Sequence, residues 1–167
     1  MVRRVQDFDK DWGVEYEGTL KVFRNLTDAS LGQRVGPEGR TLGRLAWHIT
    51  QSIPEMMNRT GLEVDASEEN APVPESAAHI VAAYERLGAA VRTQVREQWT
   101  DDTLAETRDM YGEPWPIGFT LEVLIRHQAR HRGQMTVLMR QAGLKVPGVY
   151  GPSKEEWVNY GTQPPEV

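Results

Sequence analysis

The fold of this chain is indicated first by residues 120–142, which read TLEVLIRHQARHRGQMTVLMRQA. Apolar residues recur there at spacings of three and four, the pattern of a helix with one buried face. The residues predicted to face inward are Leu121, Leu124, Ile125, Met135, Leu138 and Ala142. Gly143 follows directly and is a natural stop, because glycine readily adopts the left-handed conformation that ends many helices. The stretch therefore predicts one long amphipathic helix.

Three segments upstream show the same periodicity. The first, about residues 7–28, carries large apolar residues at every third or fourth position. The second begins after Thr41, a predicted N-cap, and ends near Gly61. The third begins near Ser76 and keeps one apolar face as far as Val95.

The connections between these segments vary in character. A loop rich in Gly and Pro follows the first segment, and residues 62–75 are polar. Residues 101–118 lose the periodicity, with a turn expected at 111–114 and a weak signal for short extended pieces beside it. The residues after Gly143 predict an ordered, extended tail that packs across the helices. We therefore expect an all-α fold, a four-helix bundle with an extended C-terminal tail, as a single domain over residues 1–167. The order of the helices stays open between an up-down and a crossover arrangement.

The composition is that of an ordinary globular protein, with 39% hydrophobic and 26% charged residues. No stretch approaches the eighteen or so apolar residues that a membrane span needs, so no membrane association is expected. The N-terminus runs straight into polar residues and offers no apolar core for a secretory signal. A cytoplasmic location is the resulting expectation.

Two further features of the composition restrict the chemistry. The net charge of −5 argues against a large nucleic-acid interface, which usually shows as a basic face. The chain contains no cysteine, which excludes a disulfide framework, a thiolate zinc site and a cysteine nucleophile. Any metal must therefore be held by nitrogen and oxygen, and any thiol chemistry needs a thiol from outside the chain.

Three of the four histidines fall at inward positions of predicted helices. His127 and His131 are four residues apart, so their side chains project from one helix face and can reach a single metal ion. His48 lies one turn after Leu45 on the inward side of the second helix. The fourth, His79, is expected to be an exposed residue in the first turn of the third helix. Three imidazoles with an open position are the ligand set of a catalytic rather than a structural zinc site.

The alternative for these histidines is ordinary packing in the core. A pair spaced by four arises by chance in many helices, and a buried histidine is more often hydrogen-bonded than bound to metal. The residue after His127 is Gln128, so the HExxH pattern of zinc proteases, with its glutamate base, is absent.

The histidine-rich helix resembles a known family. The string HQARHRGQ at 127–134, followed by LMRQAGL at 138–144 and Pro147, resembles the signature of the DinB-like family, named after DNA-damage-inducible genes. Upstream, LGRLAWHI at 42–49 is similar to the first histidine motif of that family, and VYGPS at 149–153 looks like its tail. The resemblance covers most of the chain.

This resemblance implies a four-helix bundle, often homodimeric, with one divalent metal ion held by His48, His127 and His131. The implied metal is nickel or zinc. Relatives of the fold include thiol S-transferases that use bacillithiol or mycothiol, and a mycothiol-dependent maleylpyruvate isomerase. Many members have no assigned reaction, so the resemblance bears more on the site than on the substrate.

Four other residues near the histidines were weighed. Gln134 lies three residues beyond His131 and is expected to contact the metal-bound water or a ligand without binding the metal itself; the alternative is that it only packs between helices. Arg130 and Arg132 are expected to point sideways or outward, in a solvated or interface role; the alternative is contact with an anionic ligand at the mouth of the site. Glu55, seven residues after His48, is a weak candidate for a proton acceptor.

These inferences lead to two functional hypotheses. The leading one is a metal-dependent enzyme, either a thiol S-transferase type of transferase or a hydrolase, acting on a small molecule with a low-molecular-weight thiol as an expected cosubstrate. The other is a non-catalytic metal-binding domain for stress response or interaction. A homodimer is expected from the resemblance, and five tryptophans and five tyrosines would supply aromatic surface for an interface. The tail is the alternative cover for that surface.

Overall fold

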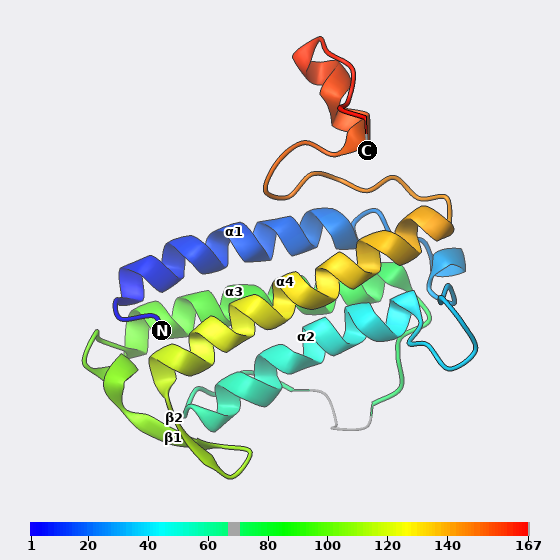
Figure 1. The fold of residues 1–167 in the computed structure, drawn as a ribbon. Helices are drawn as coiled ribbons and strands as arrows, with labels where there is room; N and C mark the ends of the chain where they lie inside the picture. The colour runs from blue at the N-terminus through cyan, green and yellow to red at the C-terminus, as the bar shows by residue number, and fades with distance from the viewer. Residues whose placement is uncertain (67–70, 167) are drawn as a thin grey trace.

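The computed structural model describes residues 1–66 and 71–166. Its frame is a bundle of four long α-helices, shown in Figure 1: α1 (Val5–Phe23), α2 (Leu42–Arg59), α3 (Ala77–Gln98) and α4 (Ile117–Gln141). This architecture confirms the predicted all-α four-helix bundle. None of the helices over the described residues is long and apolar enough to span a membrane.

The first helix ends earlier than predicted because a separate 3₁₀ helix begins a few residues after it. α1 ends at Phe23, and the 3₁₀ helix η1 (Asp28–Ser30) follows where the periodicity had suggested a continuation to residue 28. The Thr27 hydroxyl accepts a hydrogen bond from the Ser30 amide, and the Ser30 hydroxyl accepts one from the Thr27 amide. This reciprocal cap starts η1 as a separate element.

The starts of α2 and α3 follow the expected capping chemistry. The Thr41 hydroxyl accepts from the Arg44 amide at 3.1 Å, which confirms Thr41 as the N-cap of α2. The Ser76 hydroxyl accepts from the His79 amide at 3.4 Å at the start of α3. Both hydroxyls satisfy amides that have no partner within the helix.

The helices are arranged up, down, down and up. α1 packs against α3 and α4, and α2 packs against the same two helices, so α1 and α2 lie diagonally opposite. The chain after α2 runs back beside α3, where Glu63 contacts Gln94 and Asp65 pairs with Arg86. α3 therefore runs in the same direction as α2 (Figure 1). The topology left open by the sequence is thus a crossover arrangement.

A small hairpin interrupts the all-helical pattern before α4. β1 (Thr107–Met110) and β2 (Glu113–Pro116) pair antiparallel after the 3₁₀ helix η2 (Thr103–Ala105). The two turn residues, Tyr111 and Gly112, both have positive φ, at 62° and 88°, as a tight two-residue hairpin of type I′ requires. The turn was expected from the sequence, while the strands around it carried only a weak signal.

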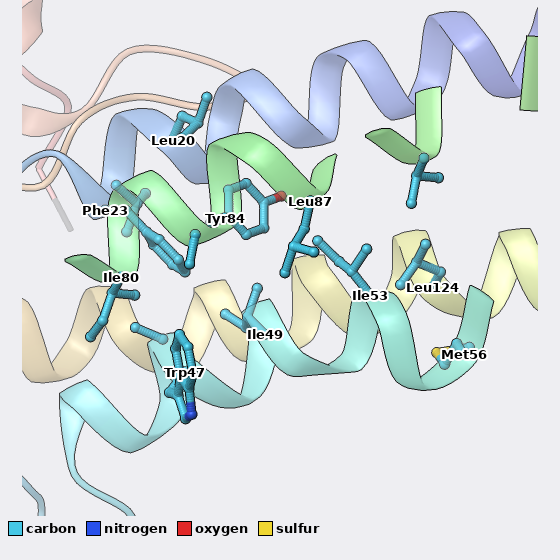
Figure 2. Close-up of a cluster of buried hydrophobic side chains, with 14 of the residues drawn as sticks. Leu20, Phe23, Trp47, Ile49, Ile53, Met56, Ile80, Tyr84, Leu87 and Leu124 are labelled. Atoms are coloured by element: carbon cyan, nitrogen blue, oxygen red, sulfur yellow. The ribbon is translucent and has the colours of Figure 1, made fainter. Parts of the chain in front are cut away.

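The core lies along the axis of the bundle. Figure 2 shows side chains from α1, α2, α3 and α4 meeting there, among them Leu20, Phe23, Ile49, Ile53, Tyr84, Leu87 and Leu124. All of these are almost completely buried. The periodicity that predicted the helices therefore also identified the faces that meet in the core.

The C-terminal tail divides into two parts. Its first part packs on the bundle: Val146 is buried, and Val149 lies against α1 at Gly18. The second part contains the 3₁₀ helix η3 (Lys154–Tyr160), which has no buried residue and projects from the bundle in Figure 1, with Glu155 near its start paired with Arg140 of α4. The prediction of a tail packed across the bundle thus describes only the first part, and a short helix replaces the expected extended chain in the second.

Candidate metal centre

The three inward histidines meet where α2 and α4 pack together. His48 lies in the second turn of α2, and His127 and His131 lie on successive turns of α4. The contact between these two helices brings together residues that are 79 positions apart in the chain. The structure therefore joins the candidate residues of both predicted helices in one cluster.

The rings of this cluster are close and edge-to-face. The ring centroids of His48 lie 4.8 Å from those of both His127 and His131, and the latter two are 4.4 Å apart. The Nε2 atoms of His48 and His127 are separated by 3.0 Å. One nitrogen from each ring lies within 4.8 Å of the others, so the three side chains could hold a metal ion.

Burial keeps two of these histidines neutral. It lowers the pKa of His48 to about 4, with smaller contributions from the charges of His131, Arg40 and Arg44. It also lowers the pKa of His127 to about 4, with His131 and His48 as the next causes. Both imidazoles are therefore neutral at pH 7 and keep a nitrogen lone pair for a ligand bond.

The donor set fits a divalent metal of borderline softness. A tetrahedral site with bonds of about 2.1 Å needs nitrogens roughly 3.4 Å apart. The distance between Nε2 of His48 and Nε2 of His127 is 3.0 Å, which is shorter than that value. The limit of 4.8 Å, within which one nitrogen of each of the three rings lies, is longer than that value. Three imidazoles suit zinc, nickel, copper or iron better than magnesium or calcium.

Gln134 forms a hydrogen bond with one histidine of the cluster, His131. Its Oε1 lies 2.7 Å from Nδ1 of His131, so the amide oxygen accepts the N–H of the tautomer that leaves Nε2 free. In metal sites, a hydrogen-bond partner of this kind fixes the orientation of the histidine ring. The sequence placed Gln134 near the site, and the structure shows that its contact is the His131 ring.

Gln128 is a positioning residue that the sequence analysis missed. It is completely buried, and its Nε2 donates to the Ile49 carbonyl at 3.2 Å and to the Ser52 hydroxyl at 3.4 Å. Its Oε1 accepts from the Tyr84 hydroxyl at 3.1 Å. These bonds tie α4 to α2 directly beside His48. Its spacing of four from Leu124 already marked it as a buried position.

The expected outward direction of Arg132 is wrong. Arg132 is 3% exposed and points toward α1, where its Nη1 lies 2.8 Å from the Glu15 carboxylate and 2.9 Å from the Thr19 hydroxyl. The Tyr150 hydroxyl of the tail bonds to both members of this pair. Arg132 is buried because a carboxylate 117 residues away meets it in the core.

The remaining candidates lie apart from the cluster. Glu55 is exposed and accepts a hydrogen bond from the Tyr111 hydroxyl at 3.0 Å, at the tip of the hairpin. It is not part of the histidine cluster, so the structure gives no support to its role as a proton acceptor there. His79 is exposed, as expected from its place at the start of α3.

A pocket of about 620 Å³ opens beside the histidines. Its lining includes His48, His131 and Gln134, and its apolar wall is formed by Val35, Leu45, Val137 and Leu138. The volume is within the range of small-molecule sites. The three-histidine cluster thus has one side that faces a cavity large enough for a small ligand.

Comparisons with known proteins agree with this fold and show the family of the chain. The model of the DinB family matches residues 1–166. The chain is 44% identical over its full length, and over the full length of the relative, to "Uncharacterized protein YrdA" of Bacillus subtilis. A DinB-like protein from Bacillus cereus has a solved structure with a TM-score of 0.86 at 45% identity, covering 90% of this chain and 100% of that one.

A more distant structure shares the fold alone. The DinB-like protein YjoA of Bacillus subtilis has a TM-score of 0.66 at 15% identity, and the match covers 86% of this chain and 97% of that one. The bundle is therefore kept while most of the sequence differs.

Proposed function

Because this chain belongs to the DinB family, we propose that it is a metal-dependent enzyme that acts on a small molecule. The proposed reaction is a transfer of the thiol S-transferase type or a hydrolysis. One observation carries the proposal: His48 and His131, two members of the histidine cluster, line the pocket of about 620 Å³. A site closed on all sides would suit a structural ion, whereas one side open to a cavity suits catalysis.

The chain's own residues would hold the ion and shape its surroundings. His48, His127 and His131 would be the ligands, and nickel or zinc is the proposed metal. When bound, such an ion lowers the pKa of a coordinated water or thiol and so supplies a nucleophile near neutral pH. Gln134 would keep His131 in the tautomer with a free Nε2, and Gln128 would hold α4 in register with α2.

The absence of cysteine is compatible with a thiol cosubstrate. The chain cannot provide a sulfur nucleophile of its own. In a thiol transfer, the external thiol would lose its proton and attack the electrophilic carbon of the second substrate, whose leaving group departs with the bonding electrons. In a hydrolysis, water takes the place of the thiol.

The experiment begins with elemental analysis of the purified protein and continues with nickel- and zinc-loaded samples. Low-molecular-weight thiols are tested with monochlorobimane as electrophile, and hydrolysable esters are tested without a thiol. We expect turnover by the wild type, loss of turnover in His131→Ala, and full turnover in His79→Ala, which removes an exposed histidine outside the cluster.

Two results would contradict the proposal. Equal turnover of wild type and His131→Ala, with both folded by circular dichroism, would separate the activity from the cluster. Metal bound in a one-to-one ratio without turnover across the thiols and esters would favour the non-catalytic metal-binding domain.

A further inference from the structure

The polar part of the pocket lining is entirely neutral or positive. Besides His48, His131 and Gln134 it contains Arg40 and Arg130, and none of its described residues is an aspartate or glutamate. This contrasts with the chain as a whole, whose net charge is −5. The cavity is therefore an electropositive place on an acidic protein, and an ion on the histidines would add to its positive charge.

The two pocket arginines also differ from most others in having no carboxylate partner. Many arginines of the described chain lie within 4.0 Å of an aspartate or glutamate oxygen: Arg4, Arg24, Arg86, Arg92, Arg96, Arg108, Arg126, Arg132 and Arg140. Over the ranges 1–66 and 71–166, no such pair is formed by Arg40 or Arg130, and no side-chain hydrogen bond of either is observed. Their guanidinium groups therefore remain available to a ligand.

The two arginines come from different elements. Arg40 lies on the loop that precedes α2, and Arg130 lies on α4 beside His131. Both side chains line the same cavity as His48 and His131. Two guanidinium groups on separate elements of one cavity can together bind an oxyanion, since the planar fork of N–H donors matches a carboxylate or phosphate.

The rest of the lining sets a second requirement on the ligand. Val35, Leu45, Val137 and Leu138 supply an apolar wall. A ligand that uses the whole cavity therefore needs an apolar segment as well as a negative charge. We infer that the pocket binds small molecules that carry a carboxylate or phosphate group, which Arg40 and Arg130 hold while the rest of the ligand lies along the apolar wall. Placing the reacting end of that ligand at the histidine cluster rests on the proposed function.

The first arm of the test measures anion binding without metal. Chelator-treated protein is titrated with glutarate and, separately, with inorganic phosphate by calorimetry at low ionic strength. An exposed charge pair changes affinity by about two- to fivefold. We therefore expect Arg40→Gln/Arg130→Gln to weaken binding by roughly tenfold. The stronger of the two anions identifies the group as carboxylate or phosphate.

The matched control is Arg44→Gln. Arg44 is an exposed arginine near the start of α2 that does not line the pocket, so this variant removes a nearby positive charge of the same kind. Its affinity for both anions should stay within about twofold of the wild type. All variants alter exposed side chains, and their thermal unfolding should match that of the wild type.

The second arm asks whether the anion site acts together with the histidines. Cobalt-loaded protein is titrated with 3-mercaptopropionate and with 3-mercapto-1-propanol, and the visible spectrum reports sulfur bound to cobalt. The two thiols differ only in having a carboxylate or a hydroxymethyl group. We expect the anionic thiol to bind roughly tenfold more tightly to the wild type, and the preference to disappear in the double variant.

The outcomes separate this inference from the proposed function. Equal anion affinity in wild type and double variant, or no anion binding by the wild type, would overturn the inference whatever the enzyme activity. Anion binding that depends on Arg40 and Arg130, in a protein without turnover, would support the inference and contradict the proposed function.

Discussion

At the scale of single residues, neighbours on α4 serve different parts of the molecule. Successive helical residues point about 100° apart, so adjacent side chains leave the helix toward different partners. His131 faces the histidine cluster, whereas Arg132 faces α1 and pairs with Glu15. The pair is buried, with Arg132 3% and Glu15 6% exposed, so each charge depends on the other for its compensation.

Removing one partner of this pair should be strongly destabilising. Glu15→Ala leaves the Arg132 guanidinium buried without its carboxylate, and we expect a loss of about 3–5 kcal/mol in the free energy of unfolding. Urea unfolding followed by circular dichroism measures it. The double variant Glu15→Leu/Arg132→Met, which removes both charges, should recover much of the loss. The control Arg24→Ala breaks an exposed pair and should cost less than about 1 kcal/mol.

At the scale of elements, close approach of α1 and α3 depends on a glycine. A Cβ atom added at Gly88 would lie 2.4 Å from the ring of Tyr16 on α1, and the Gly88 carbonyl accepts a hydrogen bond from the Trp12 indole at 2.9 Å. The two helices therefore meet at a point where α3 has no side chain. Gly133 on α4 contrasts with it, because an added Cβ there would meet nothing within 4 Å.

Alanine substitutions at these two glycines should have opposite effects. Gly88→Ala should destabilise the protein by about 1–3 kcal/mol, because the Tyr16 ring must move and the helices must separate. Gly133→Ala should stabilise it by up to about 1 kcal/mol, because alanine favours the helix and has free space. Thermal unfolding of the two variants beside the wild type tests both. Equal effects would show that helix propensity alone governs the two sites.

At the scale of the whole molecule, the bundle has a core that does not depend on the histidine cluster. The buried side chains of all four helices form one continuous hydrophobic cluster that includes Phe8, Trp12, Ile53, Tyr84 and Leu124. The cluster of histidines lies at the side of this core and opens to the pocket. Metal binding would therefore stabilise an already folded bundle.

Chelation should accordingly leave the fold intact. We expect the helical circular dichroism to persist after treatment with a chelator, while the midpoint of thermal unfolding falls because a bound ion stabilises the folded state by mass action. Adding nickel or zinc back should restore the midpoint in the wild type and leave His127→Ala unchanged. Loss of the helical signal on chelation would contradict this expectation.

The second part of the tail leads to a proposal about assembly. Val158 and Tyr160 of η3 are 74% and 67% exposed, and η3 buries no residue on its own bundle. Exposed aromatic and aliphatic side chains on a projecting element are typical of an interface. We propose a homodimer in which this segment packs on the second copy.

Light scattering at micromolar concentration tests the dimer. The full chain should have a mass of about twice 18.9 kDa, and removal of residues 153–167 should shift it toward the monomer. Substitution of the exposed Tyr111, on the hairpin at the far end of the bundle, serves as the control and should leave the mass unchanged. A mass near 18.9 kDa that does not depend on concentration would exclude the dimer.

Features that depend on neighbours within a few positions could be predicted from the amino-acid sequence. Spacings of three and four predict the helices α2, α3 and α4, because one helical turn sets which side chains share a face. The same spacing predicts that His127 and His131 project from one face. The Thr41 cap and the turn at 111–114 likewise depend on local hydrogen bonds and backbone conformation. The same spacing places His48 on the inward side of its helix, and the family resemblance implied that it shares a metal ion with His127 and His131.

Which of these faces meet could be read only from the folded structure. Local spacing does not predict that α1 and α2 lie diagonally opposite. It also does not predict that His48 approaches His127 across 79 positions, or that Arg132 is buried against Glu15 across 117 positions. The same holds for Arg40, whose place beside the histidines depends on how the loop before α2 lies against α4. Such contacts form because four amphipathic faces must close around one core, and the energy of that packing depends on all four helices together.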